Sequence, residues 1–409
     1  MTTYKLAFVV PLLIPVLCAQ TSERLSLASA VSEARRSHPV MRAAEDRVQS
    51  AEGLRLQAGL GLNPRLILQS ENTRLWDRPA FRFQDDADNF VYLSQVFETS
   101  RKRQRRVEFA SGTVRLLTSE RAVLERQIAG RVSLAYWSAA SASQIRDVLG
   151  ENVKAFEGVI QYNRDRVREG AVAEVDLLRV MLERDRLLVS AQSAEEDYNQ
   201  AIVALLREMG RSTFGSLQLT DSLSELRDVE LPEPAAILRM RPEWEASEAA
   251  VARAEAALRL QRAYTTPDPE VLFGYKRTAG YDTLLGGFQI NLPFRNRNQG
   301  QVSSAQAEIR LAQNQARALE TQIRAEVEAA SSLYQARRRL LKETLGPMRE
   351  RADEIARIAL AAYQEGGFDL LRFIDATRAR LDTLTLYYRT LADYQQSVTS
   401  LQIATGAQL

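Results

Sequence analysis

Apolar residues recur every three or four positions over long stretches of the chain. The clearest run lies within residues 302–334, at Val302, Ala305, Ile309, Ala312, Ala316, Leu319, Ile323, Val327, Ala330 and Tyr334. This spacing is that of a heptad seam and predicts a long helix packed against other helices. From about residue 299 to 364 the helix would extend roughly 100 Å at about 1.5 Å per residue, with a bend at Gly346-Pro347. An elongated molecule is therefore expected.

A weaker seam follows Lys102, at Val107, Ala110, Val114, Leu117, Leu124 and Ile128. After each long helical stretch the chain breaks briefly, at residues 169–171 and 364–367, and a returning helix follows near 174–209 and 369–405. This order predicts two antiparallel helical hairpins of unusual length.

Four short runs alternate apolar and polar residues instead. They cover residues 65–73, 90–98, 270–277 and 287–293. Their length is near the 9 to 11 residues with which a tilted strand crosses a membrane. Four strands cannot close a barrel, and an open edge in lipid would leave backbone groups unpaired. Three copies would supply twelve strands, so we expect other chains to complete the sheet.

The two halves of the chain follow one plan of helix, strand pair and hairpin. Leu149-Gly150 and Leu345-Gly346 stand at the same offset as Glu169-Gly170 and Glu365-Gly366. We expect a first repeat over residues 24–209 with its strand pair at about 65–98. A linker rich in Ser, Asp and Pro follows at 210–234, and a second repeat at 235–409 has its strand pair at about 270–293.

The first residues have the layout of a secretory signal. Lys5 precedes an apolar run over residues 6–17, and the polar Gln20 follows closely. We expect residues 1–19 to be removed, after either Cys18 or Ala19. The only cysteine, Cys18, is a candidate for lipidation, although the large Leu17 before it argues against this. No later apolar stretch reaches the length of a membrane helix, so the exported chain is periplasmic, secreted or part of a membrane β-barrel.

Charge and composition exclude several classes of function. The 54 basic and 52 acidic residues nearly balance, so no global field favours a nucleic-acid partner. The single histidine, His38, precedes Pro39 and is best interpreted as a helix-boundary residue. No carboxylate pair is spaced for acid and base work. We therefore predict no enzyme activity, no catalytic or metal-binding residue and no cofactor.

One basic cluster follows the second strand run, at Arg101, Lys102, Arg103, Arg105 and Arg106. We expect it at the periplasmic edge of the membrane, where it would contact lipid phosphates or a neighbouring chain. The alternative is a solvated helix face.

Two strings at the expected hairpin tips are the most specific motifs. The first contains Gly170, Ala171, Asp176 and Leu178, and the second contains Gly366, Gly367, Arg372 and Asp375. Together with residues 291–300, they resemble the TolC family of outer-membrane efflux proteins over nearly the whole mature chain. Gln95, Lys102-Arg103 and residues 296–300 look most like the heavy-metal efflux branch.

The resemblance implies a mixed α/β membrane protein, mainly α. Long antiparallel helical hairpins would form a trimeric α-barrel that crosses the periplasm, and four strands per chain would contribute to a shared twelve-stranded transmembrane β-barrel. The tip turns would contact the periplasmic adaptor of a tripartite pump, and an inner-membrane pump would drive export through this passive duct. The alternative is a periplasmic coiled-coil adaptor or structural spacer. The cargo and the cognate pump stay open.

One position departs from the family pattern. Some members carry two aspartates in the second tip string, where the closed tube narrows, whereas this chain has Arg372 at the first position and Asp375 at the second. We hypothesise that these residues pair across protomers at the periplasmic aperture and hold the tube shut.

Overall fold

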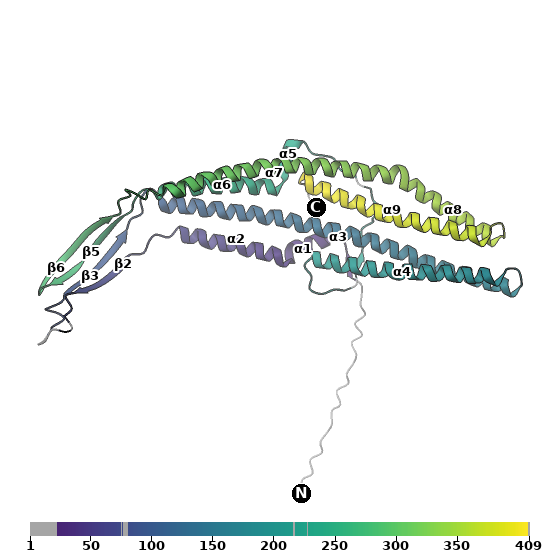
Figure 1. Ribbon diagram of the computed structural model, residues 1–409, viewed down its shortest axis with the longest axis horizontal. Coiled ribbons are helices and arrows are strands. Elements are labelled where there is room, and N and C mark those ends of the chain that lie inside the picture. The colour runs from purple at the N-terminus through teal and green to yellow at the C-terminus, as the bar shows by residue number, and fades with distance from the viewer. Residues whose placement is uncertain (1–22, 75, 77–80, 216, 227, 408–409) are drawn as a thin grey trace, which may run out of the picture.

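The computed structural model describes residues 23–407, apart from residues 75, 77–80, 216 and 227. The molecule is elongated, with a sheet at one end, two helical hairpin tips at the other and the C-terminus near the middle (Figure 1). The predicted signal segment and Cys18 lie outside the described residues.

The first half contains α1 (Leu27–Ser37), α2 (Pro39–Ala58), β2 (Arg65–Glu71), β3 (Asp88–Val96), α3 (Lys102–Arg168) and α4 (Glu174–Glu208). The second half contains α5 (Pro234–Met240), α6 (Pro242–Ala263), β5 (Pro269–Thr278), β6 (Tyr281–Ile290), α7 (Gln299–Arg339), η1 (Leu340–Leu345), α8 (Gly346–Gln364) and α9 (Leu370–Thr405). The mainly helical fold with few strands agrees with the sequence prediction. Among the described residues, no helix is both long and apolar enough to span a membrane.

The long helix of the second half is interrupted where the sequence predicted a bend. Residues Leu340–Leu345 form a π-helical turn, and the amide of Gly346 donates to the carbonyl of Leu341, five residues back. Pro347 follows and has no N–H to continue the α-helical ladder. Figure 1 shows the change of direction between α7 and α8. In the first half, α3 passes through Gly150 as an uninterrupted helix.

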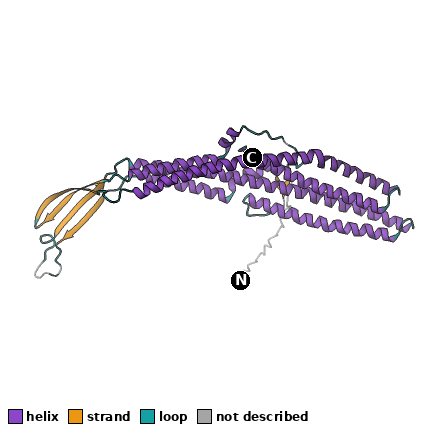
Figure 2. Ribbon diagram, turned by 45° about the horizontal axis from the view of Figure 1, so that its top comes forward, coloured by secondary structure: helices purple, strands orange, loops and turns teal. Residues whose placement is uncertain are grey.

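The sheet has the order β2-β3-β5-β6, and every neighbouring pair is antiparallel. Ala279 and Gly280 both have positive φ, as a type I′ turn requires, and join β5 to β6 in a tight hairpin. Within the described chain, β2 and β6 each pair with one strand only, so both edges of the sheet are open. Figure 2 shows the strands gathered beyond the ends of the helices.

Among the described residues, two hydrophobic cores lie along the helices. The waist core joins α3, α4 and α9 and includes Ile128, Tyr136, Leu205, Tyr394 and Leu401. The tip core also joins these helices and includes Phe156, Val180, Leu187, Phe373 and Ile374. The two hairpins therefore pack together at the waist and again near their tips.

The predicted linker is tied to the waist. The hydroxyl of Tyr198 donates to the carbonyl of Leu217 at 2.7 Å, and the hydroxyl of Tyr136 donates to Asp221 at 2.6 Å. The side chain of Gln395 donates to two further linker carbonyls. Leu217–Leu219 forms the short strand β4, which pairs in parallel with β1 (Glu23–Leu25) and joins the linker to the start of the described chain.

Candidate functional site

Alternate residues give the sheet one continuous apolar face. Its members are Leu66, Leu68, Val91, Leu93, Val271, Phe273, Tyr275, Leu284, Phe288 and Ile290, which the strand register places side by side. All are exposed, and even Ile290 exposes 39% of its surface. An exposed apolar surface of this extent indicates contact with lipid or with another protein.

The opposite face of the sheet carries a polar network. The guanidinium of Arg65 donates to the hydroxyl of Ser94 at 3.3 Å and forms an ion pair with Glu270. The hydroxyl of Ser94 donates to the same Glu270 carboxylate, and Ser94 is only 1% exposed. The sheet therefore separates an apolar surface from a hydrogen-bonded polar one, as a wall between lipid and water requires.

The structure places the members of the predicted basic cluster in two different environments. Lys102 is 3% exposed, and its ammonium contacts Asp268 at 2.6 Å and the carbonyl of Thr266 at 2.5 Å. Arg106 forms an ion pair with Glu98. These two cations hold the junction between strand and helix, so they are not available to a lipid phosphate.

The remaining members of the cluster lie at the surface. Arg101 and Arg103 are exposed, and Arg101, the residue before α3, has a positive φ. Arg105 is half-buried and pairs with Glu108 at 2.7 Å. Only Arg101 and Arg103 keep the exposure that a membrane-edge contact would need.

The two tip turns have the same backbone geometry. Gly170 and Gly366 adopt positive φ angles of 74° and 81°. In each turn the glycine amide and the next amide donate back to carbonyls of the preceding helix, which is a Schellman motif. Both glycines are exposed, so the tips are open to a partner.

The other predicted tip residues lie around these turns. Ala171 and Gly367 are exposed at the turns, and Leu178 exposes 57% of its surface on α4. Asp176 is half-buried in the first turn of α4.

Arg372 and Asp375 lie three residues apart on α9 and are both exposed. The guanidinium of Arg372 lies over the ring of Phe368, 5.6 Å from its centroid. The chain therefore exposes both side chains at the tip end of α9.

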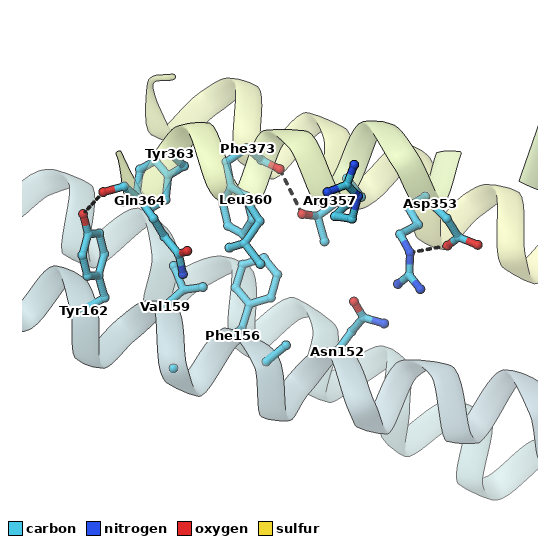
Figure 3. Close-up of a pocket in the computed structure, with 15 residues that line it drawn as sticks. Asn152, Phe156, Val159, Tyr162, Asp353, Arg357, Leu360, Tyr363, Gln364 and Phe373 are labelled. Atoms are coloured by element: carbon cyan, nitrogen blue, oxygen red, sulfur yellow. Dashed lines mark hydrogen bonds and ion pairs between the residues drawn. The ribbon is translucent and has the colours of Figure 1, made fainter. Parts of the chain in front are cut away.

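Sequence reasoning missed the contacts that join the two hairpins. The hydroxyl of Tyr363 on α8 donates to the amide oxygen of Asn163 on α3 at 2.6 Å, and Asn163 is fully buried. The ring of Tyr363 stacks on Phe373, with centroids 5.2 Å apart, and Phe373 in turn contacts Phe156. Burial raises the pKa of the Tyr363 hydroxyl, so it stays a donor. Figure 3 shows these rings meeting between the helices.

A second link joins α4 to α9. Arg378 binds the Glu183 carboxylate through two nitrogens, with 2.7 Å between Nε and Oε1. The Arg378 hydrogen bond holds the pKa of Glu183 below its ordinary value. The linked residues stand 200 and 195 positions apart, close to the offset between the two tip glycines. Polar residues at that offset are the signal that could have found them.

A cavity of about 540 Å³ opens between the hairpins beside these links. Residues of α3, α8 and α9 line it, and Figure 3 shows Phe156 and Asn152 on one side facing Leu360 and Arg357 on the other. Across the described residues, no group of three or more His, Cys, Asp or Glu side chains could hold a metal ion.

Comparisons with known proteins find chains of similar sequence and similar fold. No family model matches the chain. The cobalt-zinc-cadmium resistance protein CzcC of Cupriavidus metallidurans is 26% identical over 401 residues, 96% of this chain and 93% of that protein. The solved structure of CusC, described in terms of transmembrane channel formation, has a TM-score of 0.76 at 18% identity over 93% of this chain and 92% of its own. The Campylobacter jejuni CmeC outer membrane channel has a TM-score of 0.75 at 15% identity, over 93% and 85% of the two chains.

Proposed function

We propose that this chain, which resembles the TolC family in sequence and fold, is the outer-membrane channel component of a tripartite efflux system. The exposed apolar face of the open-edged sheet carries the proposal. At about 1.5 Å per residue, the 67 residues of α3 extend roughly 100 Å away from that sheet. A duct that begins in the outer membrane and reaches across the periplasm needs both features. The adaptor alternative is not favoured, because the chain combines two hairpins with one sheet at their far end.

Three copies of the chain would close the sheet into a twelve-stranded barrel. The apolar face would then contact lipid, and the Arg65, Ser94 and Glu270 network would line the wet interior. The periplasmic tips at Gly170 and Gly366 would contact the adaptor, with an inner-membrane pump behind it. The likeness to CzcC supports the heavy-metal branch.

In this proposal, the duct opens where the two hairpins contact each other. The Tyr363–Asn163 hydrogen bond and the Glu183–Arg378 ion pair hold the closed arrangement, so adaptor binding must weaken them if the hairpins are to separate. At the aperture, Arg372 of one protomer would pair with Asp375 of the next.

The native mass of protein extracted in detergent from separated outer membranes tests the assembly. A particle of three chains in the outer-membrane fraction is expected. A periplasmic monomer without membrane association would refute the duct and favour the adaptor.

Leak conductance in planar bilayers tests the aperture. Arg372→Ala should raise the leak of the closed duct, because it removes one partner of each pair between protomers. Arg179→Ala, which removes an exposed arginine near the other tip, is the matched control. A closed state that leaks no more in Arg372→Ala than in the control would remove this pairing from the proposal.

A further inference from the structure

The cavity between the hairpins has the size of a small-molecule site. Its volume of about 540 Å³ falls within the roughly 300–1,000 Å³ typical of such sites. It lies where α3 of one hairpin faces α8 and α9 of the other, so a molecule bound there would touch both hairpins.

The inner wall of the cavity is apolar and largely aromatic. Phe156 and Val159 come from α3, Leu360 from α8 and Phe373 from α9. The centroids of Phe156 and Phe373 lie 5.8 Å apart, with an angle of 33° between the rings. Flat aromatic groups pack well against such surfaces.

Two arginines stand at the rim of the cavity. The charged side chains that line it are Arg357, Arg380 and Asp353. Arg380 contacts Asp353 through Nε at 2.6 Å, and Arg357 contacts Glu354 through Nε and Nη2. A guanidinium has five N–H donors, so each arginine keeps donors for a further acceptor.

We propose that this cavity binds flat aromatic molecules that carry one anionic group, such as an aromatic sulfonate or carboxylate. The aromatic part packs on the wall that Phe156, Leu360 and Phe373 form, and the anion accepts hydrogen bonds from Arg357 and Arg380. A ligand that binds only while the hairpins are together stabilises that arrangement by mass action. This consequence, unlike the binding itself, rests on the proposed function, in which the hairpins must separate for the duct to open.

Calorimetric titration of the full chain in lipid nanodiscs with naphthalene-2-sulfonate tests the binding. Gly158 lines the cavity, and a Cβ there would have no neighbour within 4 Å, so the side chain of Gly158→Leu extends into open space. Gly150 lies on the same helix with equal space but does not line the cavity, which makes Gly150→Leu the matched control. Both changes favour helix, so the fold should be retained. We expect affinity to fall at least about tenfold in Gly158→Leu and to change less than about twofold in Gly150→Leu. Equal affinity in the two variants, or no binding to the unaltered protein, would overturn the proposal.

A charge comparison tests the ligand class. Arg357→Gln should weaken binding of naphthalene-2-sulfonate about tenfold, as expected for the loss of a charge-assisted hydrogen bond, and leave the neutral 2-naphthalenemethanol unaffected. Arg351→Gln, elsewhere on α8, is its control. Neutral and anionic probes binding equally well would overturn the anionic class. The titration needs no channel activity, so it tests this inference separately from the proposed function. An outer-membrane trimer that does not bind the probe would reject only this inference. A chain that binds the probe but is found outside the outer membrane would reject only the proposed function.

Discussion

His38 caps the end of one helix and the start of the next. It ends α1, and its ring nitrogen Nδ1 accepts from the amide of Val40 at 3.1 Å to cap α2. Only 8% of its surface is exposed. Burial lowers the pKa of its imidazole, and nearby Arg131 lowers it further. The buried ring is therefore held in its neutral form, which is the form that can accept this hydrogen bond.

Folding stability should consequently depend on pH through His38. The folded pKa lies below the ordinary value, so the unfolded chain binds more protons as pH falls below about 6.5. The contribution of the neutral ring is fully present above that pH and is lost as pH decreases toward the folded pKa. Thermal unfolding midpoints measured from pH 5 to 8 should fall toward acid, and His38→Asn, which keeps a capping acceptor, should flatten that part of the profile. An unchanged profile in the variant would contradict this assignment.

Tyr363→Phe should weaken the contact between the hairpins. The change leaves the buried Asn163 oxygen without its donor, at a cost of about 1–3 kcal/mol. Unfolding in detergent should therefore occur at lower temperature, and leak conductance should rise. Tyr281→Phe, which alters a highly exposed tyrosine on β6, is the control. If both variants behave alike, the hydrogen bond does not hold the hairpins together.

The helical hairpins differ in how their returning helices begin. Asp369 caps α9 through a hydrogen bond from the Arg372 amide at 2.9 Å, whereas α4 follows Ala173, which has no capping side chain. Both turns nevertheless depend on a glycine with positive φ. The shared requirement is one of backbone conformation, and it explains why each tip string contains glycine at the helix end.

Alanine at either tip glycine should destabilise its turn. The left-handed conformation costs an alanine about 1–2 kcal/mol, so Gly170→Ala and Gly366→Ala should each lower the free energy of unfolding by about that amount. Gly53→Ala inside α2, where a Cβ has open space, should instead stabilise by about 0.5–1 kcal/mol. Chemical denaturation of the three variants makes the comparison, and a loss of the same size at Gly53 would exclude the turn as the cause.

Local patterns predicted the helices, the strands and the tip turns, because each depends on residues close in sequence. The strand predicted over residues 65–73 is β2 (Arg65–Glu71), whereas the one predicted over residues 287–293 is β6 (Tyr281–Ile290), which begins six residues earlier. The break predicted at Gly346-Pro347 follows a π-helical turn. The burial of Lys102 could not be predicted, since a run of basic residues suggests a solvated face and its partner Asp268 lies far along the chain. The inter-hairpin pairs were missed for the same reason. Their signal appears only when the two repeats are aligned.

The two ends of the elongated molecule have different kinds of surface. The sheet presents apolar side chains outward, whereas the hairpins are charged along their surfaces and tied together by ion pairs. One end thus suits an apolar environment and the other suits water. The surface changes from apolar to charged at the short junction that Lys102, Asp268 and Arg106 stabilise.

Arginine substitutions on the two faces of β5 should differ in their effect on the amount of protein in the outer membrane. Phe273 lies on the apolar face, and the adjacent Leu272 lies on the opposite face. In a barrel, Phe273→Arg would place a charge in lipid at a cost of about 2–4 kcal/mol, whereas Leu272→Arg would face the wet interior. Fractionation of cell membranes should find less Phe273→Arg than Leu272→Arg protein in the outer membrane. Equal amounts would refute the assignment of the faces.

The two open edges of the sheet also predict how a defective chain would affect normal chains in the same cell. Because β2 and β6 each lack a second neighbour among the described residues, every barrel of the proposed kind needs sound edges from all three subunits. In a cell that makes normal and defective chains in equal amounts, random mixing leaves only about one trimer in eight without a defective member. An edge mutation that still lets the chain join a trimer would therefore suppress most of the product of a normal gene copy and behave as a dominant trait.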